Sequence, residues 1–248
     1  MDAWVVPVAT ATLSTVGAFV SVWYGTRAAR VERRNSAEEL AIRFREPLLQ
    51  AVFNLETRVY NIVKLDFFGR FLAPESTPGE KEYAELNTLY LFAQYFCWVE
   101  IIRRESQFVD PRNIERNRAV AHTLEAVRDT LAESVRIPDR TFRLFRGEQR
   151  ALGELMLVPV TETSGSVPRW ECLGYAAFVG SLDEAHFARW FTRLRADIAA
   201  HVSDGSQLRL CLVQGCLMDI VEELDPEMIR IPQQFRERLV ATGDSGKP

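Results

Sequence analysis

The feature that most constrains this chain is a long uncharged run near its start. Residues 3–24 read AWVVPVATATLSTVGAFVSVWY and hold no charged side chain over twenty-two positions. Four arginines follow directly, at Arg27, Arg30, Arg33 and Arg34. At about 1.5 Å per residue, a helix of this length reaches roughly 33 Å, which is enough to cross the hydrocarbon core of a bilayer. The run therefore predicts a transmembrane helix followed by a basic juxtamembrane segment.

The charges around this run indicate its orientation. A secretory signal peptide carries positive charges before its apolar stretch, whereas here Asp2 precedes the run and the arginines follow it. We therefore expect a retained, single-pass anchor. Because basic residues at the end of a span stay on the cytoplasmic side, the N-terminus should face outwards and the rest of the chain the cytoplasm. The alternative is a buried N-terminal helix of a soluble domain.

One face of the expected anchor carries only small or hydroxylated side chains. They recur at spacings of four, three, four and four residues: Thr10, Ser14, Gly17, Ser21 and Gly25. Such a stripe lets membrane helices approach closely, so it favours self-association of the anchor. The alternative is that these residues are ordinary filler in a modestly hydrophobic span.

Composition excludes several classes of function. The formal net charge is −4, so there is no electrostatic case for binding nucleic acid, although the arginines after the anchor suit anionic lipid headgroups. Only three of the thirty basic residues are lysines, a bias typical of a GC-rich bacterium. We expect the anchor to lie in the inner membrane of the cell. The four cysteines and three histidines show no metal-ligand spacing, and the common nucleotide-binding and serine hydrolase motifs are absent. We therefore predict no metal and no cofactor.

The remainder of the chain predicts an all-α, bundle-like cytoplasmic domain over 35–241, with a disordered tail over 242–248. Ser36 and Glu39 form a capping box before a helix that should run to about residue 72. Its apolar face is formed by Leu48, Val52, Leu55, Val59 and Ile62. A turn-rich loop over 73–81 should end this helix.

The segment over 82–108 is expected to be the core helix of that domain. It contains fourteen consecutive uncharged residues, 86–99, which are too few for a second membrane span. A helix that is apolar nearly all round is buried at the centre of a bundle. The polar atoms of Tyr90, Tyr95 and Trp98 should then find hydrogen-bond partners.

The second half of the domain shows further helical patterns separated by breaks. Helices are predicted over 112–134, over 141–157 with Asp139 as N-cap, after a capping box at Ser181 and Glu184, over 206–224 and over 233–241. Between them, 158–181 is rich in Pro, Ser, Thr and Gly and lacks a clear period. This stretch predicts either a surface loop or a short β-hairpin near 158–180, and it is a point where the domain could divide.

Two segments resemble parts of uncharacterised bacterial single-span membrane proteins. They are NTLYLFAQYFCWVEIIRRE at 87–105 and FRLFRGEQRALGELM at 142–156. The resemblance implies an anchor followed by a helical cytoplasmic domain. It implies no catalytic residues.

The charged cluster in the second segment is the candidate ligand site. Arg146, Glu148, Gln149 and Arg150 stand beside Gly147, where a missing side chain can let a ligand approach closely. Two arginines could clamp a phosphate or carboxylate, with Glu148 holding one of them. The alternative is a solvated helix face with ion pairs at spacings of three and four.

Glu100 interrupts the apolar core helix and is the second candidate. If it is buried, it needs a cationic partner, for which Arg103, Arg104 or an arginine of 142–156 is available. A structural ion pair is favoured over a catalytic acid.

Three hypotheses for function follow. The first is a membrane-tethered helical module that binds a cytoplasmic partner protein or itself. The second is an effector whose anchor oligomerises and perturbs the bilayer. The third is a membrane-surface enzyme that uses Arg146, Glu148 and Arg150 on a charged substrate.

Overall fold

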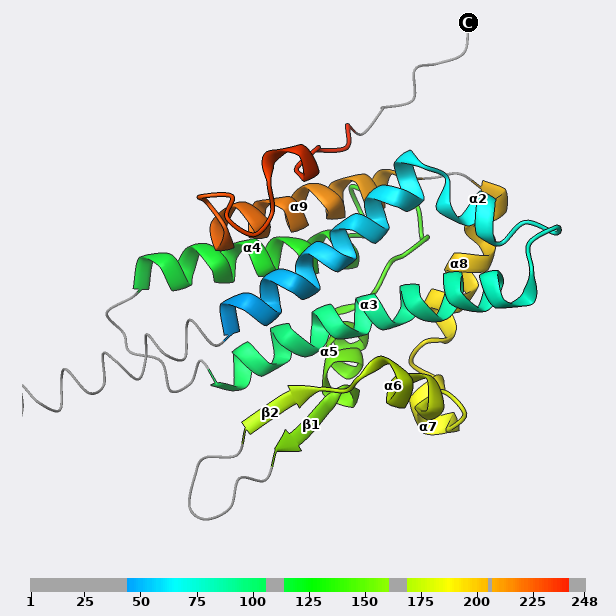
Figure 1. Cartoon of the computed structure of the whole chain (residues 1–248), viewed down its shortest axis with the longest axis horizontal. Helices are drawn as coiled ribbons and strands as arrows, with labels where there is room; N and C mark the ends of the chain where they lie inside the picture. Colours follow the sequence, from blue (N-terminus) through cyan, green and yellow to red (C-terminus); the bar gives the residue numbers. More distant parts are fainter. Residues whose placement is uncertain (1–43, 106–113, 161–168, 205–206, 241–248) are drawn as a thin grey trace, which may run out of the picture. The chain divides into compact units, whose positions relative to one another are not determined.

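The computed structural model of the chain describes residues 44–105, 114–160, 169–204 and 207–240. These parts are mostly helical, with one small sheet, as the sequence predicts (Figure 1). Among them, no helix is long and apolar enough to cross a membrane. The expected anchor, its stripe of Thr10, Ser14, Gly17, Ser21 and Gly25, and the tail over 242–248 lie outside the described residues. The anchor therefore stays a prediction.

The described helices form one compact unit around a shared apolar core. The first of them covers 44–64 and is called the 44–64 helix below. The long helices that follow are α3 (Pro78–Glu105), α4 (Ile114–Ala132) and α9 (Leu208–Leu224). In Figure 1 the 44–64 helix lies between α3 on one side and the pair α4 and α9 on the other.

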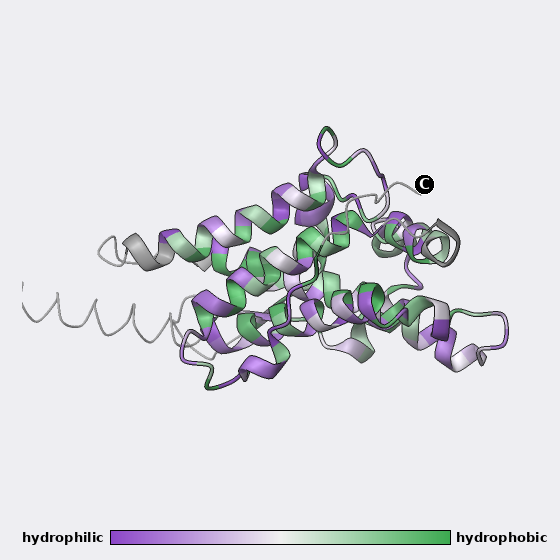
Figure 2. Cartoon of the chain, turned by 90° about the horizontal axis from the view of Figure 1, so that it is seen from above, coloured by the Kyte–Doolittle hydropathy of each residue, from purple (hydrophilic) through white to green (hydrophobic). Residues whose placement is uncertain are grey.

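The shorter elements complete this arrangement. They are α2 (Phe67–Phe71), α5 (Arg146–Leu155), α6 (Tyr175–Ser181), α7 (Ala185–Ala188), α8 (Thr192–Asp204) and the 3₁₀ turn η3 (Gln233–Phe235). Strands β1 (Leu157–Val160) and β2 (Arg169–Cys172) pair in antiparallel register, with Leu157 opposite Cys172 and Val160 opposite Arg169. Of the two alternatives left open for 158–181, a loop or a short hairpin, the strand pair is present at 157–160 and 169–172, whereas 175–181 forms α6, which neither alternative included. Most helices show hydrophobic and hydrophilic bands side by side, as amphipathic packing requires (Figure 2).

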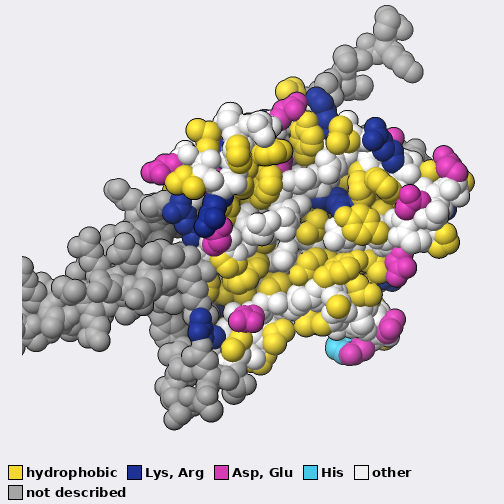
Figure 3. Space-filling view, viewed as in Figure 1, with side chains coloured by type: hydrophobic (Ala, Val, Ile, Leu, Met, Phe, Trp, Pro, Cys, Tyr) yellow, Lys and Arg dark blue, Asp and Glu magenta, His cyan; other side chains and the backbone are white. Residues whose placement is uncertain are grey.

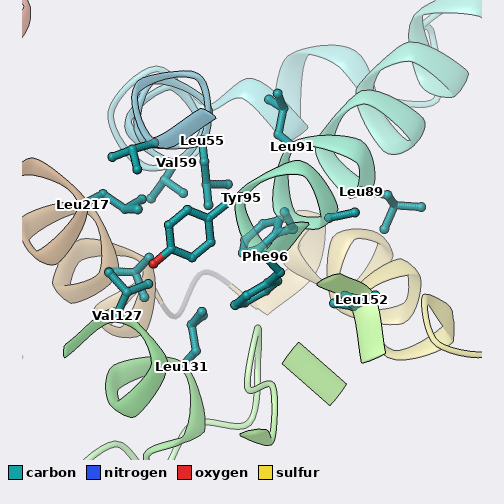
Figure 4. Packing of buried hydrophobic residues seen from close by; sticks show 14 of the residues in the cluster. Leu55, Val59, Leu89, Leu91, Tyr95, Phe96, Val127, Leu131, Leu152 and Leu217 are labelled. Carbon is teal, nitrogen blue, oxygen red and sulfur yellow. The ribbon is translucent and has the colours of Figure 1, made fainter. Parts of the chain in front are cut away.

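The expectation that α3 is the core helix is confirmed. Its side chains at Phe92, Tyr95, Phe96 and Ile101 are buried. In Figure 4 the Tyr95 ring lies among side chains from the 44–64 helix, α4 and α9. The expectation of polar partners is met only in part. The Tyr90 hydroxyl donates to the Leu173 carbonyl at 3.3 Å, but among the described residues the buried Tyr95 hydroxyl has no hydrogen-bond partner.

Close approach of α5 to α3 depends on a glycine. A Cβ atom at Gly153 would lie only 2.5 Å from the Phe96 carbonyl oxygen and 3.2 Å from Cβ of Glu100. Only glycine therefore fits at this helix crossing without a shift of the backbone. At Gly147, in the same helix, a Cβ atom would meet nothing within 4 Å.

The prediction of one helix running to residue 72 was wrong, because the helix breaks at Asp66. The helix ends at 64, and Asp66 adopts a left-handed conformation (φ 52°) before α2 begins. Asp is one of the residues that tolerate this conformation best. The loop that follows is shorter than 73–81, because α3 begins at residue 78. Thr77 and Glu80 form its capping box, with Glu80 Oε2 accepting from the Thr77 amide at 2.8 Å.

The helix predicted over 141–157 also starts later than expected. Asp139 does not cap it; its carboxylate accepts the Thr141 amide at 2.9 Å, and the chain makes a turn at 141–142 before α5 begins. Phe142 has φ 55° and is buried between the rings of Phe68 and Phe92. The packing of this ring in the core determines the backbone conformation at Phe142. Helical periodicity in the sequence cannot predict that conformation.

Two further helix boundaries were wrong. Ser181 is the last residue of α6 and donates to the Ala177 carbonyl, so it does not form a capping box with Glu184. The expected helix is split into α7 and α8, and Phe178, Phe187 and Phe191 pack together at the joint. The last helix, predicted over 233–241, shrinks to η3. An extended segment follows it, held by Gln214, whose amide donates to the Glu237 carbonyl at 2.8 Å.

Candidate functional site

The charged side chains at the start of α5 contact several different partners within the domain. Arg146 forms ion pairs with Glu125 (2.7 Å) and Asp129 of α4. Glu148 accepts the Phe145 amide at 2.8 Å at the start of α5 and pairs with Arg193 at 3.1 Å.

The other two residues of the cluster point elsewhere. Gln149 is buried, and its amide donates to the carbonyls of Arg128 and Leu144, at 2.9 Å each. Arg150 pairs with Glu154 one turn further along, at 2.8 Å. The four side chains therefore serve helix capping and helix contacts, and the structure does not bring them together around one ligand position.

Glu100 is buried and forms ion pairs with both neighbouring arginines. Its carboxylate accepts from Arg103 at 2.6 and 2.7 Å and from Arg104 at 2.7 Å. Burial raises the pKa of Glu100, but the two guanidinium groups outweigh this and hold its pKa below the usual value. The expected structural ion pair is present. A carboxylate held ionised in this way is poorly suited to act as an acid.

Arg209 of α9 is the most completely satisfied of the buried charges. Its guanidinium donates to carbonyls at the end of α4 and in the chain after it. The acceptors are those of Thr130, Leu131, Glu133, Ile137, Asp139 and Thr141, at 2.7–3.3 Å. These carbonyls include the last ones of α4, which have no partner within the helix. Arg209 therefore fixes the exit of α4.

Arg236 and Asp225 form a second completed buried pair. Arg236 donates to the Asp225 carboxylate at 2.8 Å and to the carbonyls of Asp225 and Ile231. The same carboxylate accepts three backbone amides from 229–231, at 2.9–3.1 Å. Burial raises the pKa of Asp225, but these hydrogen bonds and the arginine outweigh it and hold the pKa below its usual value. The pair secures the segment after α9.

Glu56 of the 44–64 helix has no cationic partner among the described residues. Its carboxylate accepts from Gln214 of α9 at 2.7 Å and is almost fully buried. Burial raises its pKa to about 7, although the hydrogen bonds from Gln214 and Thr57 lower it. Among the described carboxyl groups at the contact between the 44–64 helix and α9, Glu56 is therefore the one whose charge changes near neutral pH.

Arg58, one half turn further on, is buried without a carboxylate partner in the described part of the chain. Its Nη2 donates to Asn87 Oδ1 at 2.6 Å and to the Tyr83 hydroxyl at 3.3 Å. The guanidinium lies over the Phe67 ring at 3.9 Å and the Tyr83 ring at 5.4 Å. Its Nη1 is buried, and no described residue accepts a hydrogen bond from it. Burial lowers the pKa of Arg58, against smaller opposing effects from Tyr83.

The sequence did contain a signal for these buried charges, which our sequence reasoning missed. Arg58 stands three residues after Leu55 and four before Ile62, so the helical period places it on the apolar face of the 44–64 helix. Arg209 likewise interrupts the apolar start of α9. A charge at a position that the period assigns to the core marks a buried polar group.

The partly exposed face of α3 is the remaining feature. It carries five uncharged side chains at spacings of four, three, four and four: Tyr83, Asn87, Tyr90, Gln94 and Trp98, called the α3 stripe below. Hydrophobic side chains gather over α3 and the 44–64 helix in Figure 3, while most charged ones lie nearer the rim of that face. Tyr175 of α6 extends this surface, with its ring edge-on to Tyr90 at 5.2 Å.

No protein-family model, curated protein or solved structure matches the chain. Among the described residues there is also no group of three or more His, Cys, Asp or Glu side chains that could hold a metal ion. The case for function therefore depends on the chemistry of the surface and of the buried charges.

Proposed function

We propose that the described helices form an interaction module that binds a protein partner through the α3 stripe, tethered to the membrane by the expected anchor over 1–34. The observation that supports this is the stripe itself. Tyr and Trp are enriched at the centres of protein interfaces, and charged residues are depleted there. An uncharged, aromatic and partly exposed helix face has that composition.

The enzyme hypothesis has less support. Arg146, Glu148 and Arg150 are each engaged with carboxylates, amides or arginines of the domain itself. A substrate would have to displace these partners before it could bind. The hypothesis of an oligomerising anchor depends on residues outside the described part and is a separate proposal.

The partner should present a mostly apolar surface opposite Tyr90, Gln94 and Trp98, because a charged group facing this part of the stripe would lose water without gaining an ion pair. A second copy of the chain and a different protein both meet this requirement. Their crosslinked products differ in mass, so one experiment can separate them.

The test is site-specific photo-crosslinking of the full-length chain in its native membrane. A benzophenone amino acid replaces Trp98 in the stripe and, as the matched control, the exposed His122 of α4. We expect a discrete crosslinked product from position 98 that is absent from position 122. Equal background from both positions would overturn the proposal.

A further inference from the structure

The most unusual polar group in the described residues is the Arg58 guanidinium. Transfer of a cation out of water is costly unless an anion or a full set of acceptors replaces the water. Arg58 has neither: two neutral oxygens accept from Nη2, and Nη1 has no acceptor. The faces of Phe67 and Tyr83 compensate for only part of this cost.

Two neighbouring groups add donors at the same place. The Tyr83 hydroxyl and the Asn87 side-chain oxygen both accept from Arg58. Because the Tyr83 oxygen acts as the acceptor there, its own proton can be donated elsewhere, and the Asn87 amide nitrogen carries two further protons. Arg58, Tyr83 and Asn87 therefore present N–H and O–H donors from two adjacent helices.

We propose that Arg58, Tyr83 and Asn87 form a binding site for a carboxylate. Its oxygens accept from Nη1 of Arg58 and from the Tyr83 hydroxyl, so the unpaired donor and the missing negative charge are supplied together. One cation matches one carboxylate in charge, whereas a phosphate dianion would leave an excess charge in a poorly hydrated place. The site shares Tyr83 and Asn87 with the α3 stripe, but it is inferred from the unpaired nitrogen of Arg58 and does not depend on a partner protein.

The same residues indicate how the site opens and what else the ligand carries. Tyr83 is 50% exposed and its ring centroid lies 5.4 Å from the Arg58 guanidinium, so a ligand would approach from the solvent side of Tyr83. Tyr175, 38% exposed, and Phe67 provide aromatic walls nearby. We therefore expect an acid with an aromatic or apolar body to bind more tightly than acetate. Such a carboxylate could belong to a small organic acid or to a glutamate of a peptide.

The test is calorimetric titration of the full-length chain with benzoate, at constant ionic strength. Benzamide, which has the same shape without the charge, is the matched control ligand. We expect saturable binding of benzoate at least tenfold tighter than that of benzamide. The blocked dipeptide acetyl-Glu-Phe-amide, paired with acetyl-Gln-Phe-amide, distinguishes the two sources: tighter binding of benzoate indicates a small acid, and tighter binding of the dipeptide a protein carboxylate.

Variants connect the binding to the site. Arg58→Met should abolish the preference for the acid, and Tyr83→Phe, which keeps the ring, should weaken benzoate binding several-fold. Arg136→Met removes a charge from a highly exposed side chain and should leave binding unchanged. Equal affinity for benzoate and benzamide, or a charge preference that survives in Arg58→Met, would overturn the proposal. These outcomes are independent of crosslinking at Trp98, so the two proposals can fail separately.

Discussion

Two corners of this molecule each bury an arginine, and they treat it in opposite ways. At the end of α4, Arg209 donates to six carbonyl oxygens. Between the 44–64 helix and α3, Arg58 donates to two neutral oxygens and leaves one nitrogen without an acceptor. The first arrangement is complete within the chain, and the second becomes complete only with a ligand. The comparison separates a buried charge that stabilises the fold from one that the fold tolerates.

The largest expected effect is at the completed corner. Arg209→Met removes the common donor to the carbonyls after α4 and leaves several of them buried without partners. We expect the free energy of unfolding to fall by about 3–5 kcal/mol, measured by urea denaturation. A loss below about 1 kcal/mol would show that these hydrogen bonds are replaced by water, and the contrast with Arg58 would disappear.

The second prediction concerns the contact between α3 and α5, where the two helices pack closely at Gly153. Gly153→Ala places a methyl group 2.5 Å from the Phe96 carbonyl, so the two helices must separate. We expect a loss of stability of about 2–3 kcal/mol by the same measurement. Gly147→Ala, in the same helix but in open space, is the control and should raise stability by up to about 1 kcal/mol, because alanine favours a helix more than glycine does. Equal effects of the two substitutions would contradict the proposed role of the crossing.

Glu56 extends the comparison to a buried carboxyl group of the same helix, on the side that faces α9. Its pKa in the folded chain, about 7, lies above the ordinary value of 4.5, so folding favours the protonated form. This contribution is therefore fully present below about pH 4.5 and is lost as the pH rises through about 7.

We expect Glu56→Gln to be more stable than the native chain at pH 8, by roughly 1–3 kcal/mol, and nearly equal to it at pH 4. Thermal unfolding at the two pH values measures this. Asp197, whose pKa burial raises to about 6, contributes in the same direction in both proteins and so cancels in the difference. A gap between the two proteins that does not change with pH would contradict the assignment.

The sequence predicted those elements whose cause is local. The uncharged run of α3, the periodic faces of α4 and α9, and the loss of period before the hairpin each lie within one stretch of chain, so the pattern alone indicates them. The breaks at Asp66 and Phe142 depend on where distant side chains pack. Phe142, for example, takes its left-handed conformation because its ring lies between Phe68 and Phe92. The local sequence pattern cannot predict such packing between distant residues.

The candidate site was predictable to a smaller extent for the same reason. The cluster at 146–150 is conspicuous because its charges are adjacent in sequence, yet each side chain has a partner in the fold. Arg58 is one of many arginines in the sequence, and only its place on an apolar helix face marks it. That the neighbouring helix provides no carboxylate could be learned only from the three-dimensional arrangement. A buried charge becomes a candidate for function through the partners it lacks.

The smallest expected effect completes the comparison and is its sharpest test. Arg58→Met exchanges a buried, incompletely bonded cation for an apolar side chain of comparable length. Replacement of buried charges by apolar groups is often neutral or stabilising, and the lost contacts with Phe67 and Tyr83 are worth about 1 kcal/mol. We therefore expect stability within about 1 kcal/mol of the native value in urea denaturation, in the same buffer in which Arg209→Met is measured. If Arg58→Met instead destabilises the chain as much as Arg209→Met does, Arg58 is structural. The two corners would then differ in geometry without differing in role.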